Sequence, residues 1–284
     1  MSVTHRLVFL ATTFCSLACA PRSVVVGAPV APPAITTGTE LLEAMHARYA
    51  GRYLSTLSFV QNNTLYQASG GQQKTQWLEH LAVPGRLRID YLPLTGHSGV
   101  IYEGGKVHVF DNGKQIQSQP GINALLLLGF DINAQPPAAT TRTLASLGFD
   151  LEVIHEAQWQ GRRVHVVGAA AVGDSTTNQF WVDADRLLFV RMFQRNPAGT
   201  VVTEYRFDRY TDIGGFPVAI EVLMLRNGRA FFKEEYTDVR VDIPLADGLF
   251  DPARWVTAQP KIAAPPSPDD GPTDIAIEPA SSNR

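Results

Sequence analysis

The sequence predicts a mainly β protein with few helices, built around one large, strongly curved antiparallel sheet. Over much of the chain, apolar and polar residues alternate with a period of two, so that Leu87, Ile89 and Tyr91, for example, face the same way. Short turns rich in glycine, asparagine and aspartate, such as residues 111–113 and 227–228, connect the alternating stretches. Turns of this kind are typical of β-hairpins, and strands linked by hairpins run antiparallel.

The folded part is predicted to begin with a helix. Thr37 stands three residues before Glu40, which is the spacing of a capping box, and Gly51 ends the helix. Apolar residues at helical spacing give it one buried face, formed by Leu41, Leu42, Met45 and Tyr49.

The remaining elements follow in order along the chain. Because the apolar face of the sheet needs a partner, the few helices should cover its concave face or plug an open end. An up-and-down barrel of about eight strands is the nearest alternative. We expect strands at residues 86–91, 107–109, 163–168, 179–184, 187–195, 201–210, 218–226 and 230–242, and further helices at 122–128 and 142–147.

Both ends of the chain differ in composition from this body. Residues 7–20 form an apolar stretch of 14 residues, which is too short to span a bilayer and has the length of the apolar region of a secretory signal peptide, so residues 1–18 are predicted to be that peptide. Residues 16–19 (SLAC) resemble the lipobox of bacterial lipoproteins, in which the cysteine is acylated. Ordinary cleavage after Ala18 or Ala20, without a lipid, is the alternative. We expect a lipidated Cys19, a proline-rich tether over 19–36, a folded domain over 37–256 and a disordered tail over 257–284.

Composition and motif spacing exclude several classes of function. The formal net charge of −3 provides no basic surface for nucleic acid. Cys15 and Cys19 both precede the folded part, and the seven histidines show no metal-binding spacing. No phosphate-binding glycine motif occurs, and residues 96–100 (GHSGV) lack the context of a nucleophile elbow, which predicts a turn. We therefore expect no catalytic residue, no metal and no cofactor.

Several segments, taken in order, resemble the LolA/LolB-like family of periplasmic lipoprotein carriers. The resemblance covers about residues 40–255 and implies an incomplete, unclosed β-barrel whose helices form a lid over an apolar cavity for acyl chains. The segments that carry it are the opening helix with residues 57–61, residues 85–91, the hairpin at 109–114, and residues 180–191, 212–217, 236–239 and 249–252.

A cavity of this kind would lie on the inward face of the strands. Periodicity alone does not distinguish a cavity wall from a filled core, because both need an apolar inward face. The four leucines at 125–128 suit a lid that is apolar on both sides, or a fully buried helix. The candidate lipid-binding residues are Phe59, Leu87, Ile89, Tyr91, Val107, Val109, Phe180, Val182, Val190 and Met192 in the wall, and Leu126 in the lid.

Together, the residues and the resemblance predict a non-enzymatic, exported cell-envelope protein. It would bind acyl chains of a lipid or lipoprotein for carriage or insertion at the outer membrane. Its partners would be those chains, the membrane through Cys19, and an envelope protein complex, with no nucleic acid. It would lie on the periplasmic side of the outer membrane, or in the periplasm if Cys19 is not lipidated. An anchored interaction or sensor module without lipid cargo, and a hydrolase of an envelope polymer, are the alternatives.

Overall fold

The computed structural model describes residues 34–260, apart from residues 172 and 197. The chain divides between Ala34 and Ile35, and the elements below belong to the second unit. The expected signal peptide, Cys19, nearly all of the tether and most of the expected tail therefore lie outside the described residues. These parts of the domain organisation remain predictions.

In the part of the chain that the structure describes, thirteen strands form a single sheet in which every neighbouring pair runs antiparallel. The spatial order is β6-β5-β4-β3-β2-β1-β13-β12-β11-β10-β9-β8-β7, so the first and last strands of the chain pair with each other at the middle of the sheet. The strands are β1 (Thr56–Tyr66), β2 (Gln72–Ala82), β3 (Arg86–Tyr91), β4 (Gly99–Glu103), β5 (Lys106–Asp111), β6 (Lys114–Pro120), β7 (Ile154–Trp159), β8 (Arg162–Val167), β9 (Gln179–Asp183), β10 (Phe189–Arg195), β11 (Val202–Ile213), β12 (Phe216–Arg226) and β13 (Arg229–Val241).

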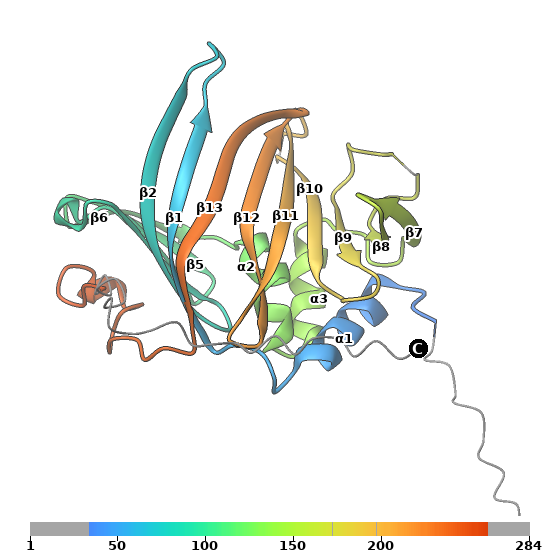
Figure 1. Ribbon diagram of the computed structural model, residues 1–284, viewed down its shortest axis with the longest axis horizontal. Coiled ribbons are helices and arrows are strands. Elements are labelled where there is room, and N and C mark those ends of the chain that lie inside the picture. Colours follow the sequence, from blue (N-terminus) through green and yellow to red (C-terminus); the bar gives the residue numbers. More distant parts are fainter. Residues whose placement is uncertain (1–33, 172, 197, 261–284) are drawn as a thin grey trace, which may run out of the picture. The chain divides into compact units, whose positions relative to one another are not determined.

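The sheet curves but does not close, because its edge strands β6 and β7 do not pair with each other (Figure 1). The predicted mainly β fold with one curved antiparallel sheet is thus confirmed, and the closed eight-stranded barrel is wrong. An open sheet of this size leaves its concave face in need of cover, since a sheet buries an apolar face only against another layer.

Three helices supply that cover: α1 (Gly38–Tyr49), α2 (Ala124–Gly129) and α3 (Pro137–Ser146). The capping box that starts α1 is present. The Thr37 hydroxyl accepts a hydrogen bond from Glu40 N (3.1 Å), and the Glu40 carboxylate accepts one from Thr37 N (3.2 Å). None of the helices within residues 34–260 is long and apolar enough to cross a membrane.

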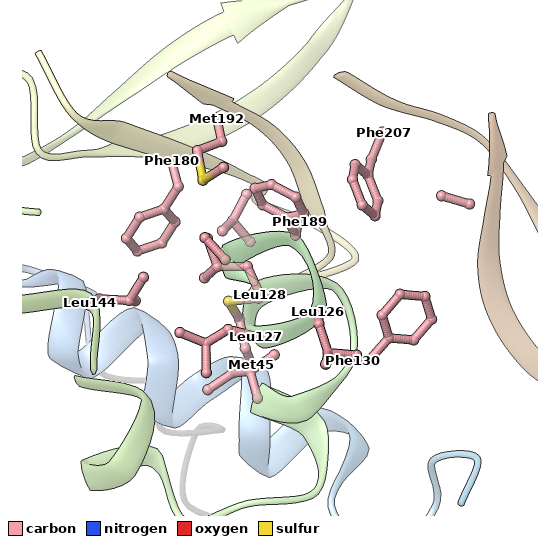
Figure 2. Packing of buried hydrophobic residues seen from close by; sticks show 14 of the residues in the cluster. Met45, Leu126, Leu127, Leu128, Phe130, Leu144, Phe180, Phe189, Met192 and Phe207 are labelled. Atoms are coloured by element: carbon pink, nitrogen blue, oxygen red, sulfur yellow. The ribbon is translucent and has the colours of Figure 1, made fainter. Parts of the chain in front are cut away.

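The main hydrophobic core lies between these helices and the concave face (Figure 2). Three of the four consecutive leucines, Leu126, Leu127 and Leu128, are buried in it. Figure 2 shows them between Met45 of α1 and the sheet. Their neighbours on the strands include Phe180, Phe189, Met192 and Phe207.

The convex face carries a smaller packed layer formed by the C-terminal segment. Arg88 of β3 is fully buried there and pairs with Asp90 (2.8 Å). Its guanidinium also donates hydrogen bonds to the carbonyl oxygens of Leu249, Trp255 and Ala258. A buried arginine needs such partners for its charge and its five donors. The segment consequently remains packed through Ala258, beyond residue 256, where the sequence predicted the domain to end.

Candidate functional site

A cavity of about 180 Å³ lies between α2 and six adjacent strands at the centre of the sheet, β3-β2-β1-β13-β12-β11. Most of its wall is apolar, as expected for a site that holds hydrocarbon. It is lined by Phe59, Gln61, Trp77, Glu79, Leu81, Leu87, Ile89, Asn123, Leu125, Leu126, Phe130, Phe207, Met224, Glu234 and Tyr236.

Some of the candidate residues predicted from the sequence meet in this cavity. Phe59, Leu87 and Ile89 line it from the strands, and Leu126 lines it from α2. Tyr91 lies beside it, with its ring 5.1 Å from that of Trp77.

Val107 and Val109 lie on the same face of the sheet but farther from the cavity. The register places Val109 opposite Val100, which in turn lies opposite Ile89. Directly opposed residues share a face. Both valines are half-buried, and neither lines the cavity.

The other candidates lie elsewhere. Phe180, Val182 and Met192 are fully buried in the core beneath the helices, so that part of the concave face is filled. Val190 lies in a separate cluster that includes Val166, Trp181 and Phe193. The period-two pattern predicts that Val190 and Met192 share a face. A bulge in β10 at this point adds one residue to the strand and places them in different clusters.

On the sheet side of the cavity, three polar side chains interrupt the apolar wall, and the sequence analysis did not predict them. Glu79 of β2 and Glu234 of β13 are buried, with 6% and 7% of their surface exposed. Gln61 of β1 lies between them. In the amide orientation that serves both carboxyls, its nitrogen donates to Glu79 Oε1 (2.8 Å) and to Glu234 Oε2 (3.3 Å). The Tyr236 hydroxyl also donates to Glu234 Oε2 (2.8 Å).

This acidic cluster, defined here as Gln61, Glu79 and Glu234, contains no cation. No lysine, arginine or histidine lines the cavity, and neither carboxyl has a salt-bridge partner within residues 34–260. Burial raises the pKa of Glu79 well above its ordinary value, and the nearby charge of Glu234 raises it further. Burial likewise raises the pKa of Glu234, to about 7. The pair therefore holds protons that exposed glutamates would lose.

A signal for this cluster is present in the sequence. On the inward face of its strand, each member lies two residues away from at least one large side chain. Glu79 lies two residues from both Trp77 and Leu81, and Glu234 lies two residues before Tyr236. An acid at an inward position of a period-two pattern marks a buried carboxyl. The pairing itself depends on the β1–β13 register, which joins residues far apart in sequence.

The residues considered for catalysis form no site. The Ser98 hydroxyl donates to Asp111 Oδ1 (2.9 Å) and accepts from Asn112 N (3.1 Å), so it stabilises a turn. Within residues 34–260, no cluster of three or more histidine, cysteine, aspartate or glutamate side chains could hold a metal ion.

No family model matches the sequence, and no curated protein matches it. Solved structures do resemble it. A putative outer membrane lipoprotein-sorting protein domain from Vibrio parahaemolyticus has a TM-score of 0.54 at 12% identity, covering 77% of this chain and 97% of that one. A DUF1329 family protein from Desulfovibrio piger gives 0.53 at 13% identity, with 75% and 95% covered. A LolA superfamily protein from Nitrosomonas europaea gives 0.50 at 11% identity, with 76% and 98% covered.

At these identities the likeness is one of fold. The domain has the LolA-like fold that the sequence resemblance predicted. Its curved, unclosed sheet with helices on the concave face is the architecture that this resemblance implied.

The raised pKa values predict how stability changes with pH. Between pH 4.5 and about 7 the folded protein holds protons that the unfolded chain releases, so the free energy of unfolding falls as pH rises through this window. For Glu234 the loss is about 3 kcal/mol. We expect Glu234→Gln to remove this part of the pH dependence and to be more stable than the wild type at about pH 8.

Urea denaturation at about pH 5 and about pH 8 measures the effect. Glu235→Gln is the matched control, because Glu235 is the next residue of β13 and pairs with Lys233 on the other face. Parallel curves of stability against pH for the wild type and Glu234→Gln would show that Glu234 ionises normally.

Proposed function

We propose that this protein is a non-enzymatic cell-envelope protein that binds the acyl chain of a lipid or lipoprotein in the cavity beneath α2. The observation that carries the proposal is the cavity itself, which has apolar walls on the concave face of an open sheet. The LolA-like fold and the name of the lipoprotein-sorting neighbour support it. Directionality would come from partners, since no nucleotide-binding motif occurs in the sequence.

The mechanism is physical. Each CH₂ group exposed to water costs about 0.8 kcal/mol, so a chain of about 16 carbons costs on the order of 12 kcal/mol to move through water unprotected. An apolar cavity removes much of this cost without any covalent step. A sheet without closed edges can also widen by small shifts between strands, which a closed barrel cannot do.

The cavity must enlarge to hold a whole chain. Its volume of about 180 Å³ is below the roughly 300–1,000 Å³ of typical ligand pockets. The element placed to move is α2, a helix of six residues. It is held at its start by Asn123, whose side chain accepts from Leu125 N and Leu126 N, and at its end by the Tyr53 hydroxyl, which donates to the Gly129 carbonyl (3.2 Å).

The expected anchor and location belong to the same proposal. The sequence around Cys19 supports an acylated cysteine behind a signal peptide, with a proline-rich tether to the domain. The protein would then lie on the periplasmic side of the outer membrane and contact an envelope complex there. Without acylation it would lie in the periplasm.

A larger side chain in the cavity should block lipid. Ile89 is half-buried and lines the cavity, so the larger side chain of Ile89→Trp should fill the cavity. Because room exists there, the substitution should lower the free energy of unfolding by no more than about 3 kcal/mol. We expect affinity for a fluorescent acyl ester to fall at least about tenfold while the domain stays folded. Fluorescence titration and urea denaturation on the same samples separate the two effects.

Ile116→Trp is the control, because Ile116 lies on edge strand β6 and is 65% exposed. It should leave binding unchanged. Equal affinities for the wild type and Ile89→Trp would place the acyl chain somewhere other than this cavity.

The anchor is tested independently. Cells that express the full chain with labelled palmitate should yield a labelled protein in the membrane fraction, because acylation adds CH₂ groups that bury in the bilayer. Cys19→Ala should abolish the label, whereas Cys15→Ala, a change within the signal segment, should not. Label that persists in Cys19→Ala would rule out acylation at this residue.

A further inference from the structure

The acidic cluster is not explained by acyl-chain binding. A hydrocarbon chain gains nothing from two carboxyl groups, and burying them opposes folding. Buried acids that serve stability are normally paired with a cation or well hydrogen-bonded. Here, within residues 34–260, the one group that can hydrogen-bond the Glu79 carboxyl is the Gln61 amide, in the orientation described above, and this bond uses only Oε1. Across the same residues, 34–260, Glu79 Oε2 has no hydrogen-bond partner, although Glu79 is more than nine-tenths buried and lines the cavity.

We propose that Gln61, Glu79 and Glu234 form a binding site for a primary amine carried by an amphiphile, whose apolar part lies along the cavity wall. The inference rests on the proposed function, since the same cavity holds both parts of the ligand. An ammonium group has three donors. It can bond the free oxygen of each carboxyl while Gln61 keeps its own bonds to the other two.

Aromatic side chains favour the same ligand. Phe59, Trp77 and Tyr236 all line the cavity beside the carboxyls, and the rings of Phe59 and Tyr236 stack at 4.1 Å. Aromatic faces attract ammonium groups, most strongly where water is excluded. A carboxylate-ended fatty acid would instead meet like charge, and an alcohol could donate only one hydrogen bond.

Binding of a cation should displace protons from the carboxyl pair, because a nearby positive charge favours the ionised form. The other titratable groups near the pair are tyrosines: Tyr236 on β13, Tyr91 on β3 and Tyr102 on β4 near Glu79, and Tyr205 on β11 near Glu234. Burial raises the pKa of each of them above the ordinary value of a tyrosine, so they stay neutral under the conditions of the test below. Helix α2 contributes no charged side chain to the lining. The released proton therefore comes from Glu79 and Glu234.

The test uses decylamine, decanol and decanoate, which share one chain and differ at the polar end, below their micelle-forming concentrations. The protein is the full chain with Cys19→Ala, titrated by calorimetry. We expect decylamine to bind at least about tenfold more tightly than the other two at about pH 8. At about pH 6 its binding should release a proton, measured from the dependence of the heat on the buffer, and its affinity should be lower.

Glu79→Gln/Glu234→Gln should lose the preference for the amine and the proton release while still binding decanol. Glu235→Gln should retain both. Equal affinity for the three probes, or a preference that survives in the double variant, would overturn the amine site and leave acyl binding intact. Failure of every probe to bind the wild type would overturn the proposed function as well.

Discussion

The structure depends on how an open sheet buries its concave apolar face. A closed barrel fills its interior with its own side chains, whereas this sheet has two free edges and needs a second layer. Helices α1, α2 and α3 supply that layer and form one continuous core with the strands. The central strands are covered by the short helix α2, and the cavity lies between them.

The same constraint makes the acidic cluster costly. Glu79 and Glu234 lie on the face that the fold must bury, and within residues 34–260 neither has a salt-bridge partner, so they remain protonated or oppose folding. On the convex face, by contrast, the buried Arg88 is balanced by Asp90 and by three backbone carbonyls. The buried charge of Arg88, which holds the C-terminal segment against the sheet, thus has a partner for each of its donors. The carboxyls at the cavity, by contrast, retain oxygen atoms without a donor in the described part of the chain, which is the pattern expected of a site that binds a ligand.

Much of the fold could be read from the sequence, because its signals are local. The capping box at Thr37, the alternation through Leu87 and Ile89, and the turn at 227–228 each specify structure within a few residues. The position of Val190 could not be read in this way, because a one-residue bulge in β10 reverses the alternation and leaves no clear mark in the sequence. The cluster was hidden for a different reason. Glu79 and Glu234 meet through the pairing of β1 with β13, and only the register reveals that two inward acids of distant strands are neighbours.

Native mass spectrometry of the exported Cys19→Ala chain, purified without detergent, shows directly whether the cavity holds an acyl chain. We expect part of the population to carry the additional mass of an acyl-chain amphiphile that dissociates on collisional activation, as a non-covalent ligand in an apolar cavity would. A bare protein mass, unchanged after incubation with excess decylamine and decanol, would mean that the space beneath α2 is a packing defect of the core. That result would contradict acyl-chain binding beneath α2.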